Sequence, residues 1–168
     1  MNRPISIFRR PFDIVLLLFF AHSIIYGALV SLPESLGYQA SPDSPWPPLR
    51  LLYNWSVAQE PGHLDPSPSL IATAAFDGFL QTPLLLFIVY GLIRQRPWLR
   101  TLSMVYAGAG VTDMFIYFVT TFVGPNPPQH PAIYLPFNLP WLIFPAVLAL
   151  RMLRQEPYPA QERRPVAA

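Results

Sequence analysis

The 168-residue chain contains no cysteine and no lysine, and charged residues make up only 12% of it. Without cysteine it can form neither a disulfide bond nor a thiolate metal site, and the pattern of its histidines does not suggest a metal site either. A soluble domain usually carries about twice this charged fraction. The composition therefore argues against a soluble domain, and we predict no metal ion and no cofactor.

In place of charge, the chain has long apolar segments. Hydrophobic residues make up 52% of the sequence, and they are clustered rather than spread evenly. Each cluster approaches the roughly 20 residues that a helix needs to cross about 30 Å of hydrocarbon. We predict an all-α membrane protein: a bundle of four transmembrane helices forming one domain, residues 11–154. The predicted spans are about 12–32, 69–93, 99–123 and 133–153.

All eleven basic residues are arginines, and ten of them lie on one side of the predicted spans. They precede the first span, connect the second to the third, or follow the fourth; only Arg50 lies in the loops of the other side. Under the positive-inside rule this asymmetry places both termini in the cytosol. Residues 1–10 are then a cytosolic N-terminus and residues 155–168 a disordered cytosolic tail. The basic excess is a topology signal, so we predict no nucleic-acid partner.

The longest loop, residues 33–68, is rich in proline and serine and is too polar to form a core of its own. Its middle, residues 49–57, is apolar and aromatic. We expect this part to lie along the outer membrane surface or to cap the bundle, because Trp and Tyr favour that boundary. Asn54-Trp55-Ser56 is a glycosylation sequon on the same side, but its closeness to the membrane disfavours its use.

Two aspartates, Asp77 and Asp113, interrupt the second and third spans. An ionisable group at bilayer depth costs about 2.5 kcal/mol or more, so it normally faces a protein-lined cavity and marks a functional site. Measured along the helices from the arginine-rich side, both aspartates, His22 and Asn138 lie about 17 to 24 Å away. We therefore predict a polar layer to which each helix contributes one side chain.

Other side chains share the helix faces of this layer. Two carboxyls that approach one another in a low dielectric cannot easily both ionise, which leaves a neutral acid beside a base. Such a pair suits proton transfer to an apolar substrate, and it equally suits the holding of a ligand hydroxyl or amine. For Gln81 and Asn138, hydrogen bonding between helices is the simpler role, and His22 is more simply a structural histidine. The neighbours on these faces are Thr73 and Gln81 beside Asp77, Tyr106, Gly110 and Tyr117 beside Asp113, and Trp141 and Pro145 beside Asn138.

At these residues the chain resembles the EXPERA superfamily, which includes the sigma-2 receptor and the emopamil-binding sterol isomerases. Asp77, Gln81 and Pro83 look like the acid, glutamine and proline of the receptor branch, and Glu60-Pro61, seventeen residues before Asp77, looks like its second acidic site. The opening Arg10-Pro11-Phe12-Asp13 and His22 are also similar to that branch. Asn138, Trp141 and Pro145 resemble the isomerases.

The resemblance implies a sterol-related function. In the isomerases an acidic pair moves protons across a sterol double bond, and a tryptophan steadies the cationic intermediate. Asp77, Asp113 and Trp141 would fill those positions. The receptor branch has an acid near the end of its first helix that is missing from residues 26–30 here, and whether Asp113 replaces it stays open. The short chain and the two-carboxylate layer favour the receptor branch.

Three functions follow from this pattern. The first is a membrane protein that binds a sterol or similar lipid and acts in lipid trafficking or regulation, in the endoplasmic reticulum membrane if the cell is eukaryotic. The alternative is a sterol isomerase with Asp77 and Asp113 as proton donor and acceptor, and the third is an assembly factor whose acids only lock the bundle. We lean away from an enzyme, and we count a homodimer or another membrane protein among the partners. The expected ligand-binding residues are Asp77, Gln81, Asp113, Tyr117, Asn138, Trp141, Glu60 and His22.

Overall fold

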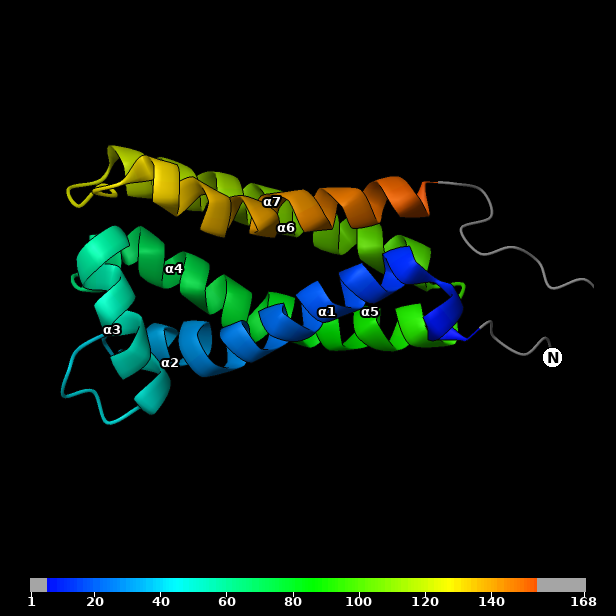
Figure 1. Cartoon of the computed structure of the whole chain (residues 1–168), viewed down its shortest axis with the longest axis horizontal. Coiled ribbons are helices and arrows are strands. Elements are labelled where there is room, and N and C mark those ends of the chain that lie inside the picture. Colours follow the sequence, from blue (N-terminus) through cyan, green and yellow to red (C-terminus); the bar gives the residue numbers. More distant parts are fainter. Residues whose placement is uncertain (1–5, 154–168) are drawn as a thin grey trace, which may run out of the picture.

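The computed structural model describes residues 6–153, which are helical except for connecting turns and loops (Figure 1). Four continuous helical stretches are long and apolar enough to cross a membrane: Pro11–Ser35, Pro68–Arg94, Leu99–Val123 and Pro131–Met152. The predicted fold class, an all-α bundle with four membrane-spanning helices, is confirmed. The orientation of the termini relative to the cytosol stays a prediction.

The first two spans are each divided by a π-helical turn. The first span consists of α1 (Pro11–Tyr26), a π turn (Gly27–Ser31) and α2 (Leu32–Ser35). The second consists of α4 (Pro68–Phe76), a π turn (Asp77–Gln81) and α5 (Thr82–Arg94). The third and fourth spans are α6 (Leu99–Val123) and α7 (Pro131–Met152).

The first span runs three residues beyond its predicted end at residue 32. Pro33 does not stop the helix, because it follows directly on a π turn in which the regular hydrogen-bond ladder is already interrupted. The helix ends instead at Ser35, and Gly37, two residues later, has a φ of 91° that suits glycine. The amides of Gly37 and Tyr38 donate to the carbonyls of Glu34 and Pro33, a Schellman closure. This extension brings Glu34 into the helical bundle.

The spans form two layers (Figure 1). One layer contains the first span beside the second, with α1 against α5 and α2 against α4, and the other contains α6 beside α7. Helices α4 and α5 join the layers through contacts with α6, whereas α1 and α7 touch much less. The short turns 95–98 and 124–130 make spans two and three, and spans three and four, antiparallel neighbours.

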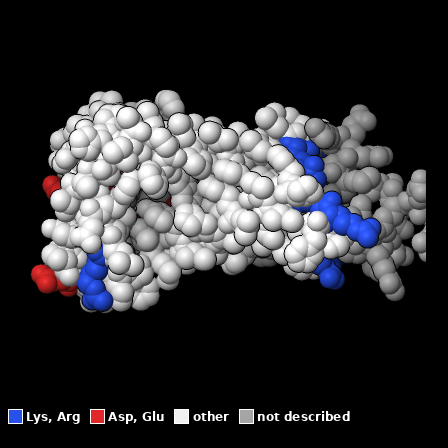
Figure 2. Space-filling view, in the orientation of Figure 1, with Lys and Arg blue, Asp and Glu red and all other residues white. Residues whose placement is uncertain are grey.

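Six of the seven arginines in the described residues lie at one end of the bundle, called here the arginine end: Arg9, Arg10, Arg94, Arg96, Arg100 and Arg151. Figure 2 shows basic side chains gathered at this end. Asp13 is fully buried and forms ion pairs with two arginines. Its Oδ2 lies 2.7 Å from Arg10 Nη1, and its Oδ1 lies 2.6 Å from Arg151 Nε. Arg10 also donates to the carbonyl of Leu92 at the end of α5. This cluster ties the ends of three spans together.

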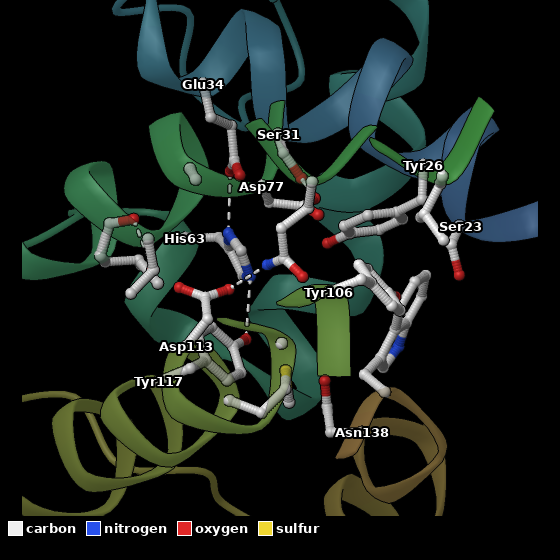
Figure 3. Close-up of a pocket in the computed structure, with 18 residues that line it drawn as sticks. Ser23, Tyr26, Ser31, Glu34, His63, Asp77, Tyr106, Asp113, Tyr117 and Asn138 are labelled. Carbon is white, nitrogen blue, oxygen red and sulfur yellow. Dashed lines mark hydrogen bonds and ion pairs between the residues drawn. The ribbon is translucent and has the colours of Figure 1, made fainter. Parts of the chain in front are cut away.

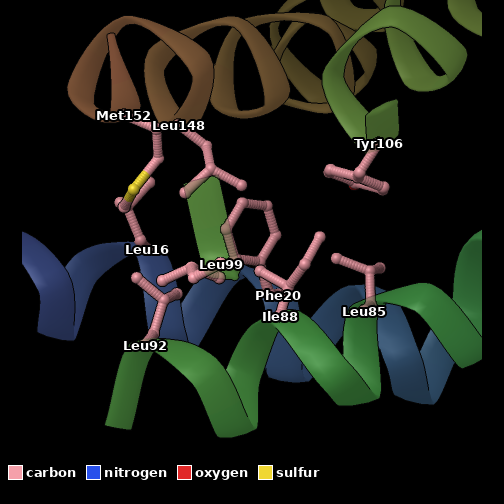
Figure 4. Packing of buried hydrophobic residues seen from close by; sticks show 9 residues of the cluster. All are labelled: Leu16, Phe20, Leu85, Ile88, Leu92, Leu99, Tyr106, Leu148 and Met152. Atoms are coloured by element: carbon pink, nitrogen blue, oxygen red, sulfur yellow. The ribbon is translucent and has the colours of Figure 1, made fainter. Parts of the chain in front are cut away.

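The half of the bundle next to the arginine end is filled by a hydrophobic core (Figure 4). Its members come from all four spans and have almost no exposed surface. Tyr106 forms the edge of this core and packs its ring at right angles to that of Phe20, with 5.7 Å between ring centres. The core residues are Leu16, Phe20, Leu85, Ile88, Leu92, Leu99, Tyr106, Leu148 and Met152.

Helix α3 (Pro47–Gln59) packs at the opposite end, called here the α3 end. Its residues Leu49 and Ser56 are fully buried, and Trp46 Nε1, just before the helix, donates to the carbonyl of Leu29 at 2.5 Å. The ring of Trp55 lies 4.6 Å from that of Phe137 on α7. Of the two placements expected for residues 49–57, the structure therefore shows the cap.

Candidate functional site

The two π turns lie against each other and set the geometry of the site. Gly78 allows this approach: a Cβ atom there would lie 2.8 Å from Leu32 Cα and 2.9 Å from Leu32 N. At this crossing Ser31 Oγ donates to Asp77 Oδ2 at 2.5 Å. π turns inside α-helices frequently mark functional sites. Here they bring Ser31, Asp77 and Gln81 to one cavity.

The cavity lies between the two layers, in the half of the bundle that the hydrophobic core does not fill, and Figure 2 shows the surface hollowed there. The centres of water-sized molecules can occupy about 90 Å³ of it. All four spans contribute to its wall, together with the short turn Pro61–His63 (Figure 3). Its polar lining residues are Ser23, Tyr26, Ser31, Glu34, His63, Thr73, Asp77, Gln81, Tyr106, Asp113, Tyr117, Asn138 and Trp141.

Each of the two predicted aspartates has a donor of its own. Asp77 accepts the hydrogen bond from Ser31, which belongs to the first span. Asp113 Oδ2 accepts from Gln81 Nε2 at 2.8 Å, so the glutamine links the second span to the third. The hydrogen bonds found among the described residues do not include one between the two carboxyls. Gln81, four residues after Asp77, connects the two acidic positions.

Six of the eight expected ligand-binding residues line the cavity: Asp77, Gln81, Asp113, Tyr117, Asn138 and Trp141. Asn138 Nδ2 donates to the carbonyl of Tyr134 in its own helix, so this bond does not join two helices. Gln81 does form the interhelical bond that its simpler role predicts. Trp141 packs against α1, with its ring centre 5.3 Å from that of Tyr26.

The other two expected residues, His22 and Glu60, are outside the cavity wall. His22 is exposed, and its ring centre lies 5.4 Å from that of Trp141. In this part of α1 the residues that face the cavity are Ser23 and Tyr26. Glu60 is buried directly behind the wall. It accepts hydrogen bonds from Tyr117 Oη and from Trp55 Nε1, the latter at 2.8 Å.

Sequence reasoning did not identify one acidic and one basic residue of the site, Glu34 and His63. Glu34 is on α2, one turn beyond the stretch in which an acid was missing, and only the extension of the first span past Pro33 reveals it. His63 lies in a proline-rich loop that gives no helical periodicity to read. Its position three residues after Glu60 was the available signal.

His63 is held between carboxylates from two segments, Glu34 and Glu60. Figure 3 shows its contact with Glu34. Its Nδ1 lies 2.8 Å from Glu34 Oε1, and its Nε2 lies 3.7 Å from Glu60 Oε1 and 3.4 Å from Tyr117 Oη. The side chains of His63, Glu34 and Glu60 are only 5%, 10% and 6% exposed. Burial by itself lowers the pKa of His63, but Glu34 and Glu60 together outweigh it and raise the pKa to about 10. The imidazole is therefore a buried cation at neutral pH.

Within the described residues, no cluster of three or more histidine or acidic side chains is arranged to hold a metal ion. What this site offers chemically is a set of hydrogen-bond donors and acceptors inside a partly apolar wall, which also contains Leu70, Ala74, Leu85 and Met114. Such a wall suits a ligand that is mostly apolar and carries a small polar group.

Comparison with known proteins supports a family assignment. The profile of EXPERA, the expanded EBP superfamily, matches residues 49–152, which include most of α3 and the last three spans. Neither a curated protein nor a solved structure shows a significant match to the chain. The matched region is more than half of the chain and contains both aspartates, Gln81, Asn138 and Trp141. The chain therefore belongs to the EXPERA superfamily.

Proposed function

We propose that this protein binds a sterol or a related lipid in its acid-lined cavity and that it serves lipid trafficking or regulation, as a member of the receptor-like branch. The observation that carries the proposal is the cavity itself. A membrane protein of the EXPERA superfamily has a hollow among its spans in which Asp77, Gln81 and Asp113 meet an apolar wall. Polar groups at this depth are costly unless they serve a ligand or one another.

The size of the cavity limits how a sterol would bind. An engineered cavity of about 150 Å³ holds a molecule the size of benzene. The 90 Å³ found here can therefore hold the hydroxyl end of a sterol and its nearest carbons, but not the whole ring system. We infer that the hydroxyl enters between Asp77 and Asp113, and that the ring body extends out of the cavity past its apolar lining residues.

A hydroxyl suits this end of the cavity because it both donates and accepts. It can donate to a carboxylate oxygen of Asp113 or Asp77. It can accept from the phenol of Tyr106 or Tyr117, which line the same wall. Burial of the remaining apolar body supplies affinity, at about 25 cal/mol for each Å² removed from water.

Two features support the receptor-like branch. Asp77 and Gln81 occupy the acid and glutamine positions quoted for it, and both face the cavity. The first span also supplies an acid, Glu34, close to where that branch has one. By the same resemblance we propose the endoplasmic reticulum membrane as the location in a eukaryotic cell, which a fluorescent fusion would check.

The alternative, a sterol double-bond isomerase, is favoured by one specific observation. Trp141 lines the same cavity as Asp77 and Asp113, so a cation that forms between the acids would lie near an indole. In this reaction one carboxylic acid adds its proton to an alkene carbon and leaves a carbocation. The other carboxylate removes a proton from a neighbouring carbon, which forms the shifted double bond.

Photolabelling tests the binding proposal. Purified protein in nanodiscs would be labelled with a diazirine analogue of cholesterol, with and without excess cholesterol. We expect saturable labelling that falls at least about tenfold in the double variant Asp77→Asn, Asp113→Asn, because no carboxylate is left to accept the hydrogen bond of the hydroxyl. Asp43→Asn is the matched control, since Asp43 is an exposed acid outside the cavity wall.

Unchanged labelling of the folded double variant would contradict a carboxyl-lined sterol site. Should a partner protein be lost while labelling persists, the acids would act in assembly instead. The isomerase has a separate test: a Δ8-sterol incubated with the protein in deuterated water. A shifted double bond that carries deuterium would establish the enzyme, and its absence would exclude this reaction for this substrate.

A further inference from the structure

The acid-lined cavity contains a cation of its own. Glu34 and His63 form part of its wall, and Glu60 lies directly behind His63. The imidazole ring is nearly inaccessible and lies between the two carboxylates, at 2.8 Å from one and 3.7 Å from the other. Neither ring nitrogen faces an open space, because Tyr117 Oη occupies the remaining approach to Nε2.

We propose that His63 acts as a built-in counter-ion that takes the place a ligand's ammonium group would otherwise occupy between Glu34 and Glu60. The imidazolium then lowers the affinity of the cavity for cationic amphiphiles relative to neutral lipid alcohols of the same shape. This inference deepens the proposed function, on which it rests, by naming the charge class of ligand that the cavity disfavours and the residue that sets this preference.

The charge count gives the physical reason. Glu34 and Glu60 contribute two negative charges and the imidazolium one positive charge, which leaves a net charge of −1 for this group. Without the imidazolium the same buried place would carry −2, and an ammonium group would be the most favourable occupant. The hydrogen bonds that Glu60 receives from Tyr117 and Trp55 keep its carboxylate in place either way.

The geometry also explains why an amine cannot simply displace the histidine. His63 is in the turn Pro61–His63, and its ring is held from α2 by Glu34 and from α6 by Tyr117. Displacement would require a segment between two helices to move and would leave a buried imidazole without its carboxylates. A neutral hydroxyl at the aspartates requires neither change.

Two competitors of one shape test the proposal. Displacement of the diazirine cholesterol probe would be measured with cholesterol and with its 3β-amine, which is cationic at pH 7. The quantity of interest is the ratio of their apparent affinities, amine over alcohol. A merely structural role for His63 would change both affinities together and leave this ratio constant.

Three variants change the charge of the group in known steps. The net charge of Glu34, His63 and Glu60 together is −1 in wild type. It becomes −2 in His63→Gln and 0 in Glu34→Gln, and it returns to −1 when both substitutions are combined. We expect the ratio to rise about tenfold in His63→Gln, to fall in Glu34→Gln and to return to the wild-type value in the double variant. If His63→Gln does not fold, the affinity ratios of Glu34→Gln and of the double variant can still be compared with the wild-type ratio.

The outcomes separate this inference from the function on which it rests. A ratio that stays constant across the folded variants while cholesterol still displaces the probe would overturn the role of His63 and leave the sterol site standing. Failure of both competitors to displace the probe from wild-type protein would instead contradict the proposed sterol site.

Discussion

Single side chains around the cavity are held by partners from other segments of the chain. Asp77 is fixed by a serine of the first span, and Asp113 by a glutamine of the second. Glu34 is fixed by the histidine of the connecting loop, and Glu60 by a tyrosine of the third span. Because these partners are within the protein, the acids are positioned before any ligand arrives. This lowers the entropic cost of ordering their side chains on binding.

His63 makes the stability of the protein fall as the pH rises into the alkaline range. Its pKa in the folded state, about 10, is above its value of about 6.5 in an unfolded chain. The stabilisation from protonated His63 is therefore fully present below pH 6.5 and is lost as the pH rises to 10. We expect the difference in Tm between wild type and His63→Gln, measured in detergent, to be largest near pH 6.5 and to shrink steadily toward pH 10.

A change at His130 provides the control for this titration. His130 is exposed in the turn before α7, so His130→Gln should leave the pH dependence of Tm as it is in wild type. A constant difference between wild type and His63→Gln over this range would show that the imidazole is not charged in the folded protein.

At the scale of helices, the paired π turns are the feature that determines the site. The apolar runs predict the spans well, and the third begins and ends at the expected residues. A π turn shifts the phase of the hydrophobic periodicity, but this shift cannot be seen in spans that are apolar on nearly every face. That is why the approach of Ser31 to Asp77, and the continuation of the first span to Glu34, could not be predicted from the sequence.

Gly78 tests whether the crossing of the two π turns supports the site. In Gly78→Ala the new Cβ would overlap the backbone of Leu32, which cannot move aside as a flexible side chain can. We expect the first two spans to separate, the bond from Ser31 to Asp77 to weaken and the protein to lose about 1 to 3 kcal/mol of stability. Thermal unfolding followed by size-exclusion chromatography would measure the loss, and photolabelling should fall with it.

Gly108→Ala is the matched control for this change. Gly108 is on α6, and no heavy atom lies within 4 Å of the Cβ that it would gain. Since alanine stabilises a helix interior relative to glycine, Tm should stay the same or rise slightly. Equal effects of the two substitutions would show that the first two spans do not depend on close approach at Gly78.

For the whole molecule, the tightly packed core and the candidate site occupy different halves of the bundle. The hydrophobic core and the buried ion pairs of Asp13 lie toward the arginine end, and the cavity lies toward the α3 end. The sequence could predict that polar residues share a depth, since helix length converts directly into distance. It could not predict that a loop residue, His63, joins them, because a loop's path is set by the helices that it connects.

Membrane orientation can be tested directly because the chain has no cysteine. We predict that the arginine end faces the cytosol. A cysteine introduced at Pro97, in the exposed turn between α5 and α6, should react with a membrane-impermeant maleimide from the cytosolic side only. Asp43→Cys, in the loop at the α3 end, should react only from the opposite side. With no native thiol, unsubstituted protein gives the background, and the reverse pattern of labelling would place the cavity in the cytosolic half of the membrane and overturn the orientation read from the arginines.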